Sequence, residues 1–283
     1  MAKELKMHNG NFIPVLSYGT WLIKNEIAAE CVKNAIEAGY RHIDTAQAYG
    51  NEEGVGQGIR DSGIKREDIF VTTKIAAEIK SYKKAKASID ESLRKLGLDY
   101  IDLILIHCPQ PWILFRGPKK FYKENLQVWK AMEEAYKEGK VKAIGVSNFL
   151  IKDLENIINN SEIKPMANQI LCHIGNTPID LIKYCQENDI VVESYSPIAH
   201  GAALKNKRLF EIADKYGVSI PQLCIKYTLQ IDTVSIPKAT SKEHIIENTK
   251  LDFEISKEDM IELLKINKTD YGEYKFWPVF SKK

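Results

Sequence analysis

The chain has 283 residues, 44% of them hydrophobic, and this length can bury a core without disulfides or structural metals. Forty basic side chains face 38 acidic ones, so no excess charge indicates a nucleic-acid or membrane partner. The first ten residues lack the apolar segment of a secretion signal, and no apolar run approaches a bilayer span. Five scattered cysteines without a CxxC spacing favour reduced thiols. We therefore expect a soluble cytoplasmic protein, most simply a monomer, that acts on a small molecule.

Apolar runs that suit strands alternate along the chain with stretches of helical period. A hairpin is expected first, over 5–15, because Asn9-Gly10 suits a two-residue turn. Strands are then expected at 15–19, 40–46, 69–75, 100–107, 141–146, 166–171, 190–194 and 233–236. Helices are expected at 28–37, 53–62, 83–96, 123–138, 151–158, 178–187, 208–216, 221–230, 242–248 and 257–266. This order predicts an α/β fold: one (β/α)8 TIM barrel domain over 1–283, with the hairpin capping its floor and two extra helices in its C-terminal half.

Four polar residues lie at or just past the ends of three successive strands: Asp44, Tyr49, Lys74 and His107. The intervals between the strands, about 30 residues each, fit one strand and its returning helix. Each residue alone has a structural explanation, such as helix capping or packing. Together they predict an active site, because the carboxyl ends of barrel strands carry it almost without exception.

These side chains suit the protonation of a carbonyl oxygen. A phenol ionises near pH ~10, so Tyr49 needs a nearby cation to act as an acid at neutral pH. Lys74 can supply that charge, Asp44 can hold Lys74, and His107 can donate a hydrogen bond to the carbonyl. The hydride has to come from a cofactor. No GxGxxG or GxxxxGK[ST] loop is present, so strand-end side chains are expected to hold any dinucleotide.

Several ordered motifs make the chain resemble the aldo-keto reductases, of the bacterial kind that includes methylglyoxal and 2,5-diketogluconate reductases. The motifs are GTW at 19–21, GYRHIDTA at 39–46, YGNE at 49–52, LGLDYIDL at 96–103, GKV at 139–141, AIGVSNF at 143–149, YSP at 195–197 and IPK at 236–238. The resemblance implies reduction of aldehydes and ketones with NADPH or NADH. It makes Tyr49 the general acid, Lys74 and Asp44 its tuning pair, and His107 the group that orients the carbonyl.

The resemblance also implies binding residues. Those expected to contact the cofactor are Thr20, Asp44, Ser147, Asn148, Gln169, Tyr195, Ser196, Lys238, Thr240, His244, Glu247 and Asn248. Trp21 and Trp112 are expected to line the substrate site with Tyr49 and His107, and Phe115, Trp277 and the aromatic tail over 271–283 are further candidates. Ordinary packing or loop hydrogen bonding remains the alternative for Asn148, Gln169 and Tyr195.

Two positions depart from the family pattern near the expected cofactor site. Ala239 replaces a serine, and His244 replaces an arginine that grips the 2′-phosphate of NADPH. A neutral imidazole offers one donor where a guanidinium offers a charged fork, so we expect weaker preference for NADPH and some use of NADH. Lys238, Thr240 and Lys242 offer an alternative grip on the phosphate. Leu171 stands where many relatives carry glutamate, and no functional consequence is assigned to it.

Other functions find less support in the sequence. A barrel hydrolase would use Ser147 with His107 and Asp44, but GVSNF at 145–149 lacks the second glycine of a nucleophile elbow. No HxH or HExxH pair supports a metal site. A non-catalytic, cofactor-sensing subunit would keep the fold, although all four reductase residues are present.

Overall fold

The computed structural model describes residues 3–267 and 269–281, and eight parallel strands in them form the barrel. Each strand pairs with the next along the chain, from β3 to β10. The barrel is closed between its first and last strands, where Ser17 donates to the Ser235 carbonyl and Gly19 to the Pro237 carbonyl, both at 2.9 Å. The strands are β3 (Tyr18–Gly19), β4 (His42–Asp44), β5 (Phe70–Ile75), β6 (Leu103–Ile106), β7 (Ile144–Ser147), β8 (Ala167–Leu171), β9 (Val191–Tyr195) and β10 (Val234–Ile236).

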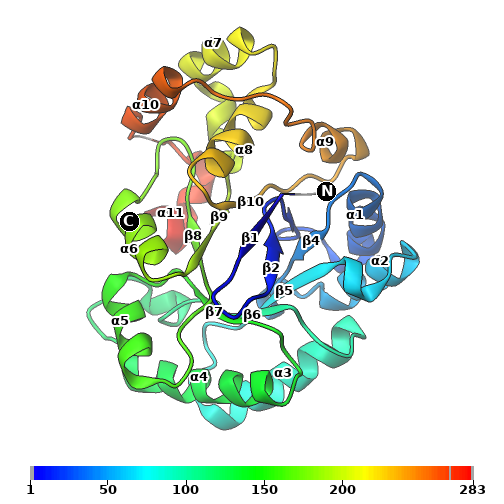
Figure 1. Ribbon diagram of the computed structural model, residues 1–283, viewed down its shortest axis with the longest axis vertical. Coiled ribbons are helices and arrows are strands. Elements are labelled where there is room, and N and C mark those ends of the chain that lie inside the picture. The colour runs from blue at the N-terminus through cyan, green and yellow to red at the C-terminus, as the bar shows by residue number, and fades with distance from the viewer. Residues whose placement is uncertain (1–2, 268, 282–283) are drawn as a thin grey trace.

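Helices surround the strands, as Figure 1 shows along the barrel. One long helix follows each strand as far as β8, and β9 is followed by two. The helices are α1 (Asn25–Glu37), α2 (Glu52–Asp61), α3 (Tyr82–Leu96), α4 (Tyr122–Lys137), α5 (Ile151–Asn160), α6 (Ile179–Glu187), α7 (Lys207–Lys215), α8 (Ile220–Gln230), α9 (Lys242–Glu247), α10 (Lys257–Lys265) and α11 (Pro278–Ser281). The expected barrel is confirmed, and α7 and α10 are its two additional helices. The short helix α11 was not expected.

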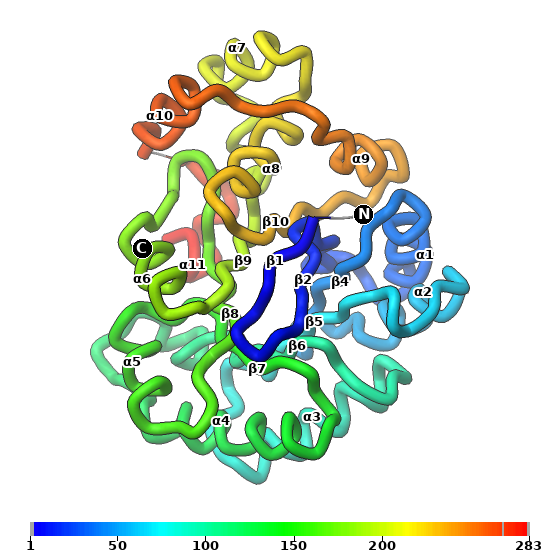
Figure 2. Tube along the Cα trace, viewed as in Figure 1, coloured from blue at the N-terminus to red at the C-terminus, as the bar shows by residue number. Residues whose placement is uncertain are grey.

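The N-terminal hairpin lies across one end of the barrel, where it is the dark blue tube near the centre of Figure 2. Its strands, β1 (Glu4–Lys6) and β2 (Phe12–Pro14), pair antiparallel with Leu5 opposite Ile13. The side chains of Asn9 and Asn11 each donate to the Lys142 carbonyl at 3.0 Å, just before β7 begins, so the hairpin caps the floor as expected. The prediction of a two-residue turn is wrong, because five residues, 7–11, join the two strands. Among these five, only Gly10 has a positive φ, of 92°.

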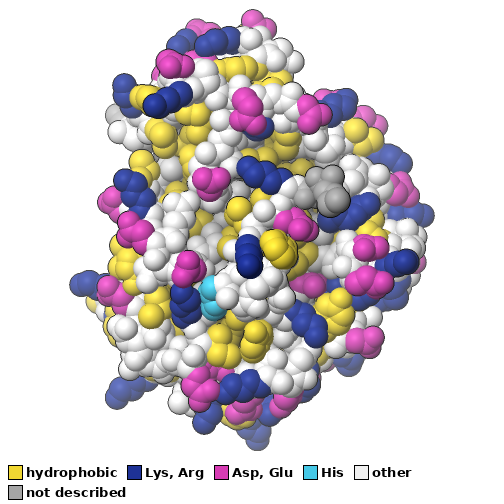
Figure 3. Space-filling model, viewed as in Figure 1, with side chains coloured by type: hydrophobic (Ala, Val, Ile, Leu, Met, Phe, Trp, Pro, Cys, Tyr) yellow, Lys and Arg dark blue, Asp and Glu magenta, His cyan; other side chains and the backbone are white. Residues whose placement is uncertain are grey.

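The hydrophobic core occupies the barrel interior near the floor and the layer between strands and helices. Trp129 of α4 is its largest fully buried side chain. Helices α2 and α3 meet so closely that a Cβ on Gly56 would lie 1.9 Å from the Leu96 carbonyl oxygen. All five cysteines are buried and free. On the face shown in Figure 3, charged side chains of both signs are interspersed. No helix within the described residues combines the length and apolarity needed to cross a membrane.

Candidate active site

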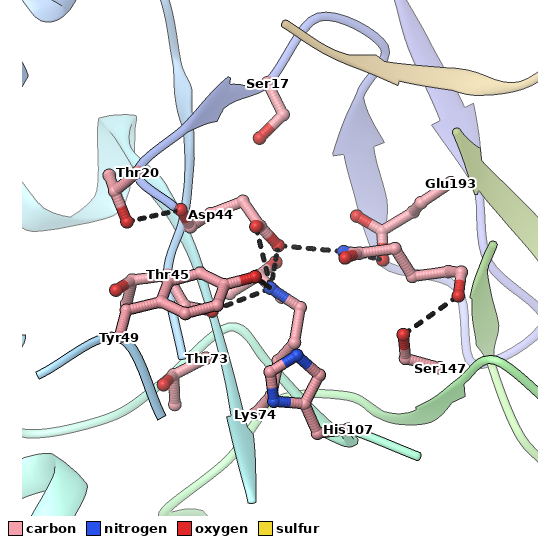
Figure 4. Close-up of polar contacts among 12 residues, drawn as sticks. Ser17, Thr20, Asp44, Thr45, Tyr49, Thr73, Lys74, His107, Ser147 and Glu193 are labelled. Atoms are coloured by element: carbon pink, nitrogen blue, oxygen red, sulfur yellow. Dashed lines mark hydrogen bonds and ion pairs between the residues drawn. The ribbon is translucent and has the colours of Figure 1, made fainter. Parts of the chain in front are cut away.

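The structure brings the four predicted catalytic residues together at the carboxyl ends of three neighbouring strands (Figure 4). Asp44 ends β4, Lys74 lies near the end of β5, and His107 directly follows β6. Tyr49 ends a single 3-10 turn, Gln47–Tyr49, after β4. Gly50, at φ 67°, then reverses the chain into α2, and this turn places the phenol over the rim of the barrel.

Lys74 is the centre of the site and is completely buried. Its Nζ donates to both carboxylate oxygens of Asp44, at 2.7 and 2.8 Å, and to the carbonyl oxygen of Thr45 at 2.8 Å. The same Nζ lies 3.4 Å from the Tyr49 hydroxyl oxygen. A buried ammonium with a bidentate carboxylate partner keeps its charge, and that charge faces the phenol.

The pKa values of this cluster follow from burial and the ion pair. Burial lowers the pKa of Lys74, but Asp44 and Tyr49 more than offset this, so it lies above its ordinary value and the lysine is charged at neutral pH. Loss of hydration raises the pKa of Tyr49, and Lys74 offsets part of that rise. Lys74 therefore stabilises the phenolate, but it does not fully offset the effect of desolvation.

His107 is a neutral imidazole in this environment. Burial, together with the charges of Lys74 and Lys80, holds its pKa well below the ordinary value. Its ring lies edge-on to those of Tyr49 and Trp112, with centroids 5.6 and 5.2 Å away. Its Nδ1 atom is buried and makes no hydrogen bond to any described residue. A neutral imidazole can donate one hydrogen bond without bringing a second cation toward Lys74.

A buried amide, Asn51, fixes the loop that carries Tyr49. Its Nδ2 donates to the carbonyl oxygens of Thr20 and Ile23, both at 2.9 Å. Its Oδ1 accepts from the Thr45 hydroxyl at 2.8 Å. Thr20 in turn donates from its hydroxyl to the Asp44 carbonyl at 2.9 Å. Because each bond joins a different segment of the rim, these bonds fix the loop and so help to place the phenol.

Four expected nicotinamide-binding residues lie on or directly after the next three strands and contact one another. Asn148, at φ 62°, donates from Nδ2 to the His107 carbonyl and accepts at Oδ1 from the Tyr195 hydroxyl at 2.8 Å. The Ser147 hydroxyl donates to the Gln169 carbonyl at 2.9 Å. The Gln169 amide nitrogen donates to Asp44 at 2.8 Å, while its side-chain oxygen accepts no hydrogen bond from the described residues. That open acceptor and the Tyr195 ring fit a planar carboxamide-bearing ring.

The residues expected at the far end of the cofactor gather after β10. Lys238, Thr240 and His244 are exposed there, and His244 lies in the first turn of α9. Glu247 pairs with Lys250 at 2.5 Å, and Asn248 is buried. Lys238 and Lys242 are exposed cations close in sequence to His244, and such a group of side chains suits an anion. Ser196 directly follows β9, and its hydroxyl is 3.0 Å from His200 Nε2.

Aromatic side chains surround the mouth of the site. Trp21 lies edge-on to His200 and Trp277, with centroids 5.0 and 5.4 Å away. Trp112 packs against Phe115, which is almost completely buried. The tail reaches this rim: α11 contributes Phe280 to a cluster with Leu171, Ala199 and Tyr271, and Trp21 and Tyr195 pack against it.

Glu193, an acidic residue of the barrel interior, was not predicted from the sequence as part of the site. It lies on β9, directly opposite Gln169 of β8, and is completely buried. Its signal in the sequence was a single glutamate inside the apolar run of 190–194, two positions before Tyr195 and therefore on the same face of the strand. His42, two positions before Asp44, is buried below the site in the same way.

Comparisons with known proteins agree with this geometry. The profile of the Aldo/keto reductase family matches residues 15–268. Glyoxal reductase of Bacillus subtilis is 42% identical over 272 residues, 95% of each chain. Methylglyoxal reductase DkgA of Escherichia coli is 37% identical over 93% of each chain.

Solved structures show the same fold. An aldo/keto reductase from Brucella melitensis superposes with a TM-score of 0.87 at 39% identity, over 94% of this chain and 100% of that one. The Bombyx mori aldo-keto reductase in complex with NADP superposes with a TM-score of 0.85 at 34% identity, over 99% and 98%. The chain therefore belongs to the aldo/keto reductase family and is an NAD(P)H-dependent oxidoreductase of aldehydes and ketones.

Proposed function

We propose that Tyr49 is the general acid of carbonyl reduction in this chain, with Lys74, Asp44 and His107 as the groups that make it effective. The observation that supports this most strongly is the position of Lys74 Nζ. It lies 3.4 Å from the Tyr49 hydroxyl oxygen and is held by both oxygens of Asp44. A buried ammonium at this distance stabilises the phenolate that remains after proton transfer.

The nicotinamide cofactor supplies the hydride when it is bound. Within the chain, His107 donates a hydrogen bond to the substrate oxygen and so orients the carbonyl beside Tyr49. The Tyr49 hydroxyl then donates its proton to that oxygen, and the Lys74 charge stabilises the phenolate. Asp44 keeps Lys74 charged and in place. Ser147, Asn148, Gln169 and Tyr195 hold the cofactor ring, and the surrounding aromatic side chains keep water away.

The variant Tyr49→Phe tests this assignment. It keeps the ring and removes only the proton donor, so kcat for reduction of an aldehyde, followed at 340 nm, is expected to fall by ~1,000-fold or more. NADPH affinity, measured by quenching of protein fluorescence, is expected to change less than threefold. Tyr100→Phe, which alters a phenol near the floor, is the matched control. Full activity of Tyr49→Phe would contradict the proposal, and a wild type inactive on a broad carbonyl panel would favour the cofactor-sensing alternative.

We propose small aldehydes and dicarbonyl compounds as the substrate class. The relatives named as glyoxal and methylglyoxal reductases support this choice. The rim of Trp21, Trp112 and Trp277 suits a compact apolar body, whereas the polar groups of Tyr49 and His107 suit one carbonyl oxygen.

We propose that the chain uses NADPH and, to a useful extent, NADH. His244 is exposed at the start of α9, and no guanidinium is present at that position. The ratio of kcat/KM for the two cofactors with one aldehyde is the measurement. A preference for NADPH of ~1,000-fold or more, worth about 4 kcal/mol, would refute NADH use. The variant His244→Arg is expected to raise that ratio.

We also propose that residues 1–283 form one domain and act as a cytoplasmic monomer without a nucleic-acid partner. The near balance of 40 basic and 38 acidic side chains and the five buried free thiols support this. Light scattering coupled to gel filtration is expected to give the mass of one chain, and a dimer mass would contradict the monomer.

A further inference from the structure

Glu193 is a completely buried carboxyl group that the proposed mechanism does not use. In Figure 4 its side chain lies on the side of Asp44 away from Tyr49. The parallel register places it opposite Gln169 on one side and Val234 on the other. It therefore shares the barrel interior with the ion pair of Asp44 and Lys74.

The two buried carboxyl groups have very different partners. Asp44 accepts two hydrogen bonds from Lys74 and one from the Gln169 amide. Glu193 accepts only a long bond of 3.4 Å from that same amide nitrogen, through Oε2. Its Oε1 is buried and has no hydrogen-bond partner among the described residues. A carboxylate so poorly solvated is costly, and the carboxylic acid form avoids that cost.

The charged and titratable groups that face Glu193 come from β4 and β5. On β4, His42 Nε2 lies 3.8 Å from Glu193 Oε1, but this contact is no ion pair. Burial lowers the pKa of His42 to about 3, so the imidazole is neutral, and its Nε2 is 2.8 Å from the Thr72 hydroxyl. Asp44 of β4 is an anion, and Lys74 of β5 is already paired with it. The neighbouring strands β8 and β10 present no ionisable side chain.

We propose that Glu193 is a positioning residue: it holds a proton at neutral pH, and release of that proton adds a negative charge beside the Asp44–Lys74 pair and weakens Tyr49 as an acid. This inference rests on the proposed role of Tyr49. The Gln169 amide connects the two carboxyl groups, so the same proton also affects how firmly Gln169 is held.

The direction of the effect follows from electrostatics. Burial, and then the Asp44 charge, raise the pKa of Glu193 to about 8, and Lys74 and Gln169 oppose the rise. Once Glu193 is ionised, two anions face one ammonium, and the phenolate of Tyr49 becomes harder to form. Reduction is therefore expected to slow as the pH rises past about 8. Tyrosine and lysine side chains with unperturbed pKa values of ~10 do not yet lose their protons at that pH.

The kinetic test compares wild type with Glu193→Gln, whose amide has the same shape and no proton to release. In wild type, kcat for reduction is expected to fall about tenfold or more above an apparent pKa near 8. In Glu193→Gln this fall is expected to disappear, with kcat at pH 6.5 within about threefold of wild type. Lys80 needs a control, because burial also lowers its pKa to about 8. Lys80→Met is expected to keep the wild-type fall, and identical pH profiles for wild type and Glu193→Gln would overturn the proposal.

A spectroscopic test needs no activity. It compares wild type with Glu193→Gln, because Glu52 is a second buried glutamate whose pKa is raised by burial. With isotope-labelled glutamate, wild type is expected to show at pH 7 an infrared carbonyl band of a protonated carboxylic acid that is lost near pH 8 and that Glu193→Gln lacks. Absence of that band at pH 7 would overturn the proposal. The two assignments fail separately: an active Tyr49→Phe would contradict the general acid, whereas the band that is missing from Glu193→Gln reports only on Glu193.

Discussion

Replacing Lys74 by methionine separates the electrostatic role of this residue from its bulk. The methionine side chain fills a similar volume but removes the charge 3.4 Å from the Tyr49 hydroxyl oxygen. With an effective dielectric constant of ~20, a unit charge at that distance stabilises a phenolate by ~5 kcal/mol. Loss of that charge raises the pKa of Tyr49 still further above its ordinary value. Since the phenolate forms in the reaction, kcat for reduction is expected to fall by ~1,000-fold or more.

The same change leaves Asp44 as a buried, unpaired carboxylate, so stability has to be measured beside activity. Lys74→Met is expected to lower the free energy of unfolding in urea by ~3 to 5 kcal/mol. The double variant Asp44→Asn with Lys74→Met removes both charges and is expected to regain most of that loss while kcat stays low. If Lys74→Met keeps kcat within tenfold of wild type, the ammonium is not what makes Tyr49 an acid.

Two further predictions concern stability. The pKa of His42 is about 3 in the folded chain and 6.5 when unperturbed, so the unfolded chain binds more protons between these values and stability falls as the pH drops below 6.5. The loss reaches ~5 kcal/mol near pH 3, and His42→Gln is expected to flatten this slope in urea titrations between pH 4 and 7. Gly56→Ala places a Cβ 1.9 Å from the Leu96 carbonyl and is expected to cost ~2 kcal/mol or more. Gln57→Ala, one position along α2 and exposed, is its control; equal costs would exclude close helix packing as the reason.

The sequence predicted the barrel and the rim of the site well, for a physical reason. Parallel strands buried on both faces read as apolar runs, and a charged residue that ends such a run has to lie at the carboxyl edge. Asp44 and Lys74 are examples, and in the structure Lys74 Nζ lies 2.7 Å from Asp44 Oδ1. The helix boundaries were predicted less accurately. The first helix was expected to begin at Ala28, the first apolar position of its pattern, whereas α1 begins three residues earlier, at Asn25.

The features that the sequence did not reveal depend on contacts between distant segments. The hairpin turn is longer than expected, and its Asn9 side chain has both a distant and a local partner: Nδ2 donates to the Lys142 carbonyl at the floor, and Oδ1 accepts from the Asn11 backbone amide. The direction of the Tyr49 pKa depends on how completely the rim withdraws the phenol from water, and no local pattern encodes that. Glu193 was overlooked because one acidic residue in a short apolar run gives no indication of which strand will face it.

The interior of the barrel favours a net charge near zero, and this constrains how the site can work. With Lys74 and Asp44 ionised and Glu193 protonated, the three groups sum to zero. Proton transfer from Tyr49 takes that sum to −1, and an ionised Glu193 would take it to −2 in a region of low dielectric constant. A buried acid that keeps its proton at neutral pH therefore leaves room for the one negative charge that the reaction creates, on the Tyr49 oxygen.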